Sequence, residues 1–272
     1  MSISRRPLRR IRLFLKGNLD LRDSLHALRL NGAVAWNGLN EVLRDRGAVA
    51  RLRHETNPRL DLLAEATGQV PATLAARALP FTAYPPASQF SAAFFEEAAD
   101  AYLLSIQQEL ATGVMRHREE GWRFYPEGMA AWGVEDRAWG RSALLPEPPP
   151  DPDAAAAALE RVIARLRAVT QAPILVFNLS AYVPGETAHS LAGFGETVAT
   201  RIRRLNLALA EVSMRTGISV IDVDRVLAGA GAARLKLDAL HMTPEGCRLV
   251  AEEVARVLED LGCLGPSTDQ SP

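Results

Sequence analysis

The sequence predicts an α/β domain in which a five-stranded parallel sheet is covered by helices on both sides, a three-layer α/β/α arrangement. Short apolar runs alternate with longer segments that carry apolar residues at helical spacing, which is typical of right-handed βαβ units. The chain has 272 residues, enough for one large domain with a substantial core. Residues 173–177 are almost entirely apolar, as expected for a strand buried on both faces. The five predicted strands are residues 11–15, 48–52, 101–106, 173–177 and 218–223.

Helices are predicted between these strands from apolar spacing, capping residues and stop signals. The first begins near Asp23, with Leu25, Leu28 and Leu30 on its apolar face. The last begins after Thr243, whose hydroxyl is suited to cap a helix. The other predicted helices cover residues 60–66, 91–98, 153–169 and 197–216.

Two segments are not predicted to belong to this framework. Residues 80–88 contain two consecutive prolines, which argue against a helix or a strand there. Residues 113–140 hold three of the four tryptophans but show weak periodicity, so they are interpreted as an insertion or a lid. With the proline-rich connector that follows, this segment extends over 113–152. We expect a single domain over residues 1–265 and a disordered tail at 266–272.

The composition argues against several classes of partner. The formal net charge is −1, so the chain has no overall basic field for nucleic acid. No apolar run approaches the roughly 18 residues of a membrane-spanning helix, and no signal segment is recognisable. Cys247 and Cys263 are too few for a disulfide framework and lack zinc-site spacing. We therefore expect a cytoplasmic protein without metal or cofactor; its oligomeric state is not indicated.

Parallel strands place their carboxyl ends at one edge of the sheet, where ligands bind in folds of this kind. This topology predicts that polar residues from distant parts of the sequence meet at that edge. They are Gly17, Asn18, His54, Glu55, Gln107, Gln108 and Asn178, together with a loop that carries Asp238 and His241. Among them, His54 and Glu55 are interpreted as an exposed polar pair rather than as a second base.

An Asp-x-x-His motif precedes the last helix. The carboxylate of Asp238 can accept a hydrogen bond from one imidazole nitrogen of His241, which fixes the tautomer and leaves the other nitrogen free to take a proton. Thr243 and Pro244 would hold the loop by starting the helix directly after it. The pattern predicts a general base, and an ordinary surface Asp and His are the alternative interpretation.

This block, Asp-x-x-His followed by a glycine and an apolar helix near the C-terminus, resembles the last block of the SGNH/GDSL hydrolases. The resemblance implies their flavodoxin-like fold and a serine nucleophile in a Gly-Asp-Ser block after the first strand. Here that position reads Gly17-Asn18-Leu19, and leucine cannot be a nucleophile. Ser24 follows five residues later in an Asp-Ser-Leu sequence. The resemblance makes Ser24 the candidate nucleophile, and a helix cap is the alternative.

The blocks that would bind the oxyanion are altered as well. Gln107 stands where the family has an asparagine, and its amide can donate the same hydrogen bond from a stem one methylene longer. The family's glycine block has two candidates, Gly38 and Gly68. The residues expected to bind the oxyanion or the substrate are Gly17, Asn18, Gln107 and Asn178.

The resemblance predicts a divergent hydrolase that cleaves an ester of a small acyl or acetyl group, so it implies a small-molecule or acylated substrate as the partner. In this mechanism Ser24 attacks, His241 takes its proton and Asp238 orients the imidazole. Two alternatives stay open. The same machinery could transfer the acyl group to an acceptor other than water if residues 113–140 exclude water. The altered blocks would also suit a catalytically silent binding or scaffold protein that kept the SGNH frame.

Overall fold

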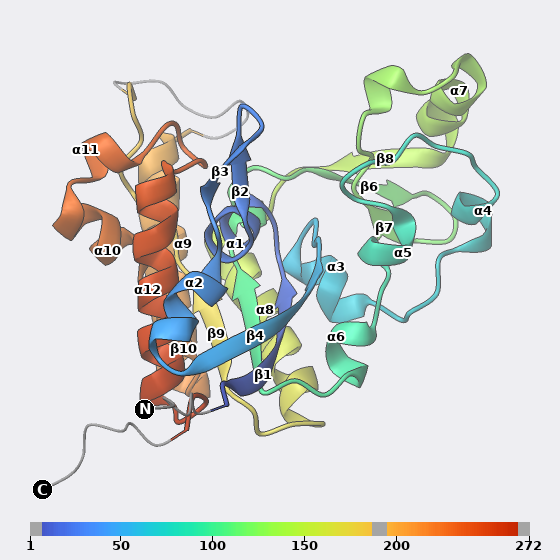
Figure 1. Cartoon of the computed structure of the whole chain (residues 1–272). Helices are drawn as coiled ribbons and strands as arrows, with labels where there is room; N and C mark the ends of the chain where they lie inside the picture. Colours follow the sequence, from blue (N-terminus) through green and yellow to red (C-terminus); the bar gives the residue numbers. More distant parts are fainter. Residues whose placement is uncertain (1–6, 187–194, 266–272) are drawn as a thin grey trace, which may run out of the picture.

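The computed structural model describes residues 7–186 and 195–265 (Figure 1); the tail predicted at 266–272 lies outside them. Within these residues five parallel strands form the central sheet, in the order β10-β9-β5-β1-β4. The predicted three-layer α/β/α fold is confirmed, and each of the five predicted strands is present. The strands are β1 (Arg9–Lys16), β4 (Ala48–Glu55), β5 (Ala101–Ser105), β9 (Ile174–Phe177) and β10 (Ser219–Ile221).

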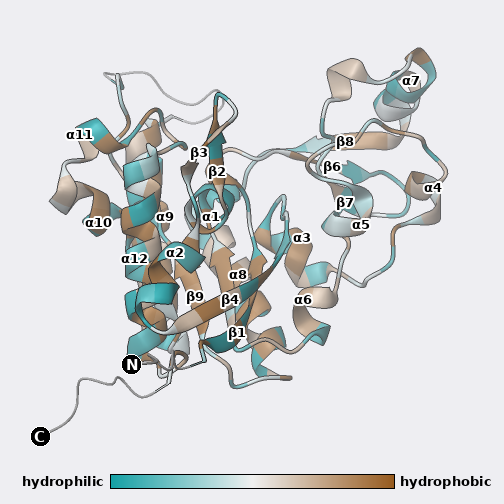
Figure 2. Ribbon diagram, viewed as in Figure 1, coloured by the Kyte–Doolittle hydropathy of each residue, from teal (hydrophilic) through white to brown (hydrophobic). Residues whose placement is uncertain are grey.

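Successive side chains of each strand point to opposite faces of the sheet. Helices cover both faces, so the side chains on each face are buried. Leu13 and Leu15 of β1 pack in one apolar cluster, whereas Phe14 between them packs in another. Figure 2 shows the apolar strands enclosed between amphipathic helices. One layer contains α1 (Leu19–Leu25), α2 (Leu39–Asp45), α10 (Val223–Ala230), α11 (Ala232–Leu235) and α12 (Pro244–Asp260); the other contains α3 (Leu60–Glu65), α6 (Ala93–Glu96), α8 (Pro152–Arg167) and α9 (Val198–Thr216).

The first helix was predicted incorrectly. α1 begins before the predicted start near Asp23 and is only seven residues long. The leucines assigned to its second half lie instead in a hairpin of β2 (Leu28–Leu30) and β3 (Ala33–Trp36). The hairpin turn is made by Asn31 and Gly32, both with positive φ, as in the Asn-Gly turns that favour hairpins. This local turn chemistry outweighs the helical spacing of the leucines.

Residues 113–147 form a small β subdomain with its own apolar core. Within the described residues its sheet has the order β7-β6-β8. The core gathers Phe124 and Trp132 with Leu74 and Leu79 from the preceding chain. The predicted insertion is therefore a packed unit, visible at the upper right of Figure 1. Its elements are β6 (Val114–His117), β7 (Arg123–Phe124), the 3-10 helix η2 (Met129–Ala131), α7 (Val134–Ala143) and β8 (Leu144–Glu147), and Leu74 of α4 (Ala72–Ala75) packs into its core.

The proline-containing segment before the subdomain is more regular than predicted. Pro86 occupies the first turn of a short helix, α5 (Pro86–Gln89), where its missing N–H has no cost. Upstream of it, the carboxylate of Glu127 accepts the backbone N–H groups of residues 82–84, which holds this part of the chain against the subdomain. In the described parts of the chain, no helix is both long and apolar enough to cross a membrane.

Candidate active site

A tight turn before α12 carries the Asp-x-x-His motif. An antiparallel bridge between Lys236 and Met242 joins its two ends, and the backbone N–H of Leu237 donates to the carbonyl of His241 at 3.0 Å. The hydroxyl of Thr243 caps α12, as predicted, by accepting a backbone N–H of the first helical turn at 3.2 Å. The bridge and the helix start together hold the turn at the carboxyl edge of the sheet.

Asp238 makes three hydrogen bonds within the turn, two of them to His241. Its Oδ1 accepts the backbone N–H groups of Leu240 and His241, each at 2.7 Å, and its Oδ2 lies 2.8 Å from the imidazole Nδ1. Burial alone would raise the pKa of Asp238, but these hydrogen bonds outweigh it and lower the pKa to about 2. The ionised carboxylate keeps a proton on Nδ1, so Nε2 is the imidazole atom that can accept one.

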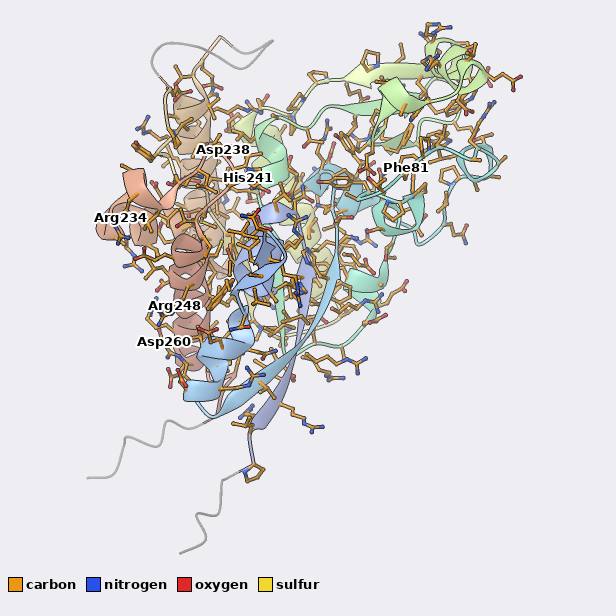
Figure 3. The ribbon with its side chains drawn as sticks, turned by 45° about the horizontal axis from the view of Figure 1, so that its top comes forward. Phe81, Arg234, Asp238, His241, Arg248 and Asp260 are labelled. Atoms are coloured by element: carbon orange, nitrogen blue, oxygen red, sulfur yellow. The ribbon has the colours of Figure 1, made fainter. Side chains whose placement is uncertain are left out.

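The Asp238–His241 pair is open to solvent. The two side chains lie together on the turn in Figure 3, and 42% of the His241 side-chain surface is exposed. A substrate or a water molecule can therefore approach the imidazole without a rearrangement of the core. The pairing that the motif predicts is present in the structure.

At the end of β1, the chain passes close to α1 and β5, so a side chain at position 17 would crowd both. A Cβ on Gly17 would lie 2.6 Å from Leu21 Cδ1 and 3.1 Å from Ser105 Cβ. The backbone of Gly17 also joins β1 to β4, because its N–H donates to the carbonyl of Glu55 at 3.2 Å. The first block of the motif thus keeps its glycine for a packing reason.

Asn18 links this turn to the segment next to the subdomain. Its Oδ1 accepts the backbone N–H of Asn57 at 3.4 Å. Burial raises the pKa of Tyr84 to about 12, and a hydrogen bond with the Asn18 side chain acts in the opposite direction. Asn18 is therefore contacted from two sides, by the chain after β4 and by the tyrosine.

Ser24 lies in the last turn of α1. Its side chain is fully buried beside the thiol of Cys247 of α12, the helix against which α1 packs. Its carbonyl accepts the indole N–H of Trp36 at 3.0 Å. The helix-cap alternative is wrong, because α1 starts after Asn18. The nucleophilic role of Ser24 stays a prediction.

The 3-10 helix η1 (Gln107–Leu110) places the two predicted glutamines directly after β5. The backbone N–H of Gln107 donates to the hydroxyl of Ser105 at 2.9 Å, and Nε2 of Gln108 donates to the carbonyl of Ser105 at 2.6 Å. The hydroxyl of Ser105 also contacts Oδ2 of Asp20. No hydrogen bond to a described residue engages the side-chain amide of Gln107, so this amide can donate to a ligand at the edge.

Asn178 braces the ends of β9 and β10. Its Nδ2 donates to Oδ1 of Asp222 at 2.8 Å, and its Oδ1 accepts the backbone N–H of Asp224 at 3.1 Å. Both ends of the amide are engaged within the protein. The predicted contact of Asn178 with substrate stays a prediction.

His54 and Glu55 are half-buried and paired with other residues, so the prediction of an exposed pair is wrong. Nε2 of His54 lies 3.1 Å from the carbonyl of Gly17, and Nδ1 lies 3.2 Å from Nε2 of His26. Since a carbonyl only accepts, His54 carries its proton on Nε2 and accepts from His26 on Nδ1. Burial lowers the pKa of His54 to about 4. Glu55 accepts from the Lys16 ammonium at 2.9 Å.

Sequence reasoning missed two charged residues at this edge, Asp20 and Lys236. Burial raises the pKa of Asp20, in the first turn of α1, to about 6. Nζ of Lys236 donates to the carbonyl of Ala239 at 2.9 Å, inside the Asp-x-x-His turn. Burial lowers the pKa of Lys236 to about 8, against the charges of Asp238, Asp20 and Asp224. The sequence could have indicated these two residues only by their positions. Asp20 directly follows Gly17-Asn18-Leu19, and Lys236 lies two residues before Asp238.

Residues 131–249 match the GDSL-like Lipase/Acylhydrolase family. The matched segment contains the Asp-x-x-His turn and Asn178 but not the β1–α1 turn. The match confirms the resemblance to the SGNH/GDSL hydrolases and supports a general hydrolase role of the esterase type. No curated protein matches the chain in sequence.

Several solved structures are similar to this chain at low sequence identity. A DUF4886 family protein from Bacteroides uniformis has a TM-score of 0.55 and 11% identity over 92% of this chain and 83% of that chain. Est24, a carbohydrate acetylesterase from Sinorhizobium meliloti, has a TM-score of 0.49 and 8% identity over 93% and 99% of the two chains. An aryl esterase from M. smegmatis has a TM-score of 0.47 and 12% identity over 93% and 99%. The first of these similarities shows a shared fold.

Proposed function

Because residues 131–249 match the GDSL-like lipase/acylhydrolases, we propose that this chain is a divergent SGNH/GDSL-type hydrolase that cleaves an ester of a small acyl or acetyl group. One observation carries the proposal: Oδ2 of Asp238 lies 2.8 Å from Nδ1 of His241. This contact holds a proton-accepting nitrogen at the carboxyl edge of a parallel sheet, where such folds bind their ligands.

His241 acts as the general base. Its Nε2 takes a proton from the attacking hydroxyl group as the new bond to the ester carbonyl forms, and the Asp238 carboxylate stabilises the resulting imidazolium. The amide of Gln107 is the side-chain donor proposed for the oxyanion.

The proposed nucleophile is a water molecule. Water reaches the exposed imidazole of His241 directly, whereas Ser24 would first have to leave its fully buried position. A fluorophosphonate probe separates these two versions, because it labels a serine that a base activates. Ester hydrolysis without any labelled serine supports water. Labelling of Ser24 that disappears in His241→Ala would make Ser24 the nucleophile.

The function is tested with p-nitrophenyl acetate, butyrate and octanoate. We expect the acetate to be the best substrate and His241→Ala to lower kcat/KM by roughly 10²- to 10⁴-fold. Leu237→Ala is the matched control, since this exposed side chain lies in the same turn. An alcohol acceptor in the same assay distinguishes acyl transfer, which would produce a new ester.

Two results would contradict the proposal. One is a wild-type protein that hydrolyses none of the esters, which would favour the silent scaffold. The other is His241→Ala with a rate close to that of Leu237→Ala, which would show that hydrolysis does not use this base.

A further inference from the structure

Asp20 is the charged side chain of the β1–α1 turn. It follows Leu19, which occupies the position of the family's serine, and lies in the first turn of α1. Asp20 retains 7% of its surface exposed, whereas Ser24 and Ser105 retain none. Among these three residues, Asp20 is therefore the one that keeps some contact with solvent.

Both carboxylate oxygens of Asp20 are hydrogen-bonded, and these bonds can form whether the carboxyl group is ionised or protonated. Oδ1 accepts the backbone N–H of Leu21 at 2.9 Å, and Oδ2 contacts the hydroxyl of Ser105. The hydroxyl of Ser105 already accepts the backbone N–H of Gln107 and keeps a second lone pair. It can therefore donate to Asp20 when the carboxylate is ionised and accept from Asp20 when it is protonated.

The charges around Asp20 connect it to the Asp-x-x-His turn. Lys236, which begins that turn, interacts with Asp20 and with Asp238. The other titratable groups that act on Asp20 or respond to it are Asp23 of the same helix and Tyr84. Burial favours the protonated form of Asp20 and raises its pKa to about 6, so this carboxyl group exchanges a proton closer to neutral pH than an ordinary aspartate does.

We propose that Asp20 is a second acid–base residue of the active site, which protonates the leaving alkoxide while His241 activates the attacking water. This inference rests on the proposed ester hydrolysis. Water forms a bond to the acyl carbon and gives a proton to Nε2 of His241. The bond between the acyl carbon and the alkoxy oxygen then breaks, and that oxygen takes the proton of Asp20. The proton on His241 returns to Asp20 through solvent, so the cycle closes without a redox change.

A purely structural role explains Asp20 less well. An asparagine could make both contacts, with Oδ1 accepting the N–H of Leu21 and Nδ2 donating to the hydroxyl of Ser105, without the cost of burying an ionisable group. A carboxyl group at this position is explained if its proton is used. The two proposed roles also match the exposure of the two side chains. His241, which activates water, is open to solvent, whereas Asp20, which protonates the leaving group, is buried.

The test compares two acetate esters that differ in their need for an acid. p-Nitrophenolate leaves without a proton, whereas the alkoxide of ethyl acetate needs one. We expect Asp20→Asn to lower kcat for ethyl acetate by roughly 10²- to 10⁴-fold and kcat for p-nitrophenyl acetate by less than about tenfold. Asp23→Asn is the matched control, because Asp23 is a largely buried aspartate of the same helix that pairs with Arg22.

Each other outcome has a defined meaning. Equal losses on both esters, or no loss on either, would overturn the role of Asp20. Should Asp20→Asn fail to fold, wild-type rates across acetate esters of graded leaving-group acidity decide: a shallow dependence supports the acid and a steep one contradicts it. His241→Ala assayed with both esters separates this inference from the proposed function, since failure of the base would appear there and not in Asp20→Asn.

Discussion

His241 Nδ1 lies 2.8 Å from Asp238 Oδ2 across a turn in which the same carboxylate also accepts two backbone N–H groups. One side chain therefore fixes the shape of the turn and the tautomer of the imidazole. The geometry does not depend on a distant part of the fold, because donor and acceptor are three residues apart.

Asp238→Asn is expected to lower kcat by roughly 10³- to 10⁴-fold while the protein stays folded. The amide oxygen can still accept the backbone N–H groups, but its NH₂ group faces Nδ1 and forces the proton onto Nε2. Nε2 then cannot act as a base. Ester hydrolysis measures the loss, and thermal unfolding confirms the fold. A variant with wild-type kcat would show that the tautomer is not used.

Glu109→Gln is expected to stabilise the protein increasingly as pH rises. Burial raises the pKa of Glu109 to about 8, and Oε1 accepts the N–H of Leu60 at 2.7 Å. The folded state holds its proton above the unfolded pKa near 4.5, so wild-type stability from this group is lost as pH rises from 4.5 to 8. Urea unfolding at pH 5, 6.5 and 8 should show the variant gaining roughly 1 kcal/mol per pH unit over wild type. A constant difference would show that Glu109 is ionised in the fold.

His54→Gln is expected to reduce the loss of stability in acid. Burial, with the charges of Arg22 and Lys16, lowers the pKa of His54 to about 4, although its bond to Gly17 acts the other way. The unfolded chain takes up the proton near pH 6.5 and the folded chain only near 4, so stability falls as pH drops through this window, by roughly 3 kcal/mol.

The raised pKa of Asp20 has the opposite effect over nearly the same window, because the folded state gains a proton below about 6. The total stability curve therefore hides the contribution of His54. The informative quantity is the difference in unfolding free energy between wild type and His54→Gln from pH 7 to 4. The unfolding free energy of the wild type minus that of the variant should decrease as the pH drops from 7 to 4. A difference independent of pH would contradict a neutral, buried histidine.

Gly17→Ala is expected to destabilise the fold by about 1–3 kcal/mol, because its Cβ would overlap Leu21 and press on Ser105. The displaced turn should also lower kcat, since Asp20 lies in it. Gly229→Ala is the control: this helical position has open space around its Cβ, and alanine there should be neutral or slightly stabilising. Equal stability of the two variants would show that the turn can move without cost.

The sequence was sufficient for features set by local chemistry. Apolar runs identified the five strands, because burial on both faces leaves no alternation to obscure them. The cap of Thr243 and the Asp238–His241 pair follow from groups a few residues apart, so spacing alone predicts them. Where two local signals competed, as in residues 23–32, the Asn-Gly turn decided against the helix that leucine spacing favoured.

Only the tertiary structure decided which side chains reach the edge of the sheet. Ser24 and Asp20 lie in the same short helix, yet its packing against α12 buries the first and leaves the second at the carboxyl end of β1. Ser105, Lys236 and Asp20 come from three distant segments, and their shared environment shifts the proton affinities of Asp20 and Lys236. Such desolvation depends on what the rest of the chain packs around a group, and for this reason no local pattern in the sequence records it.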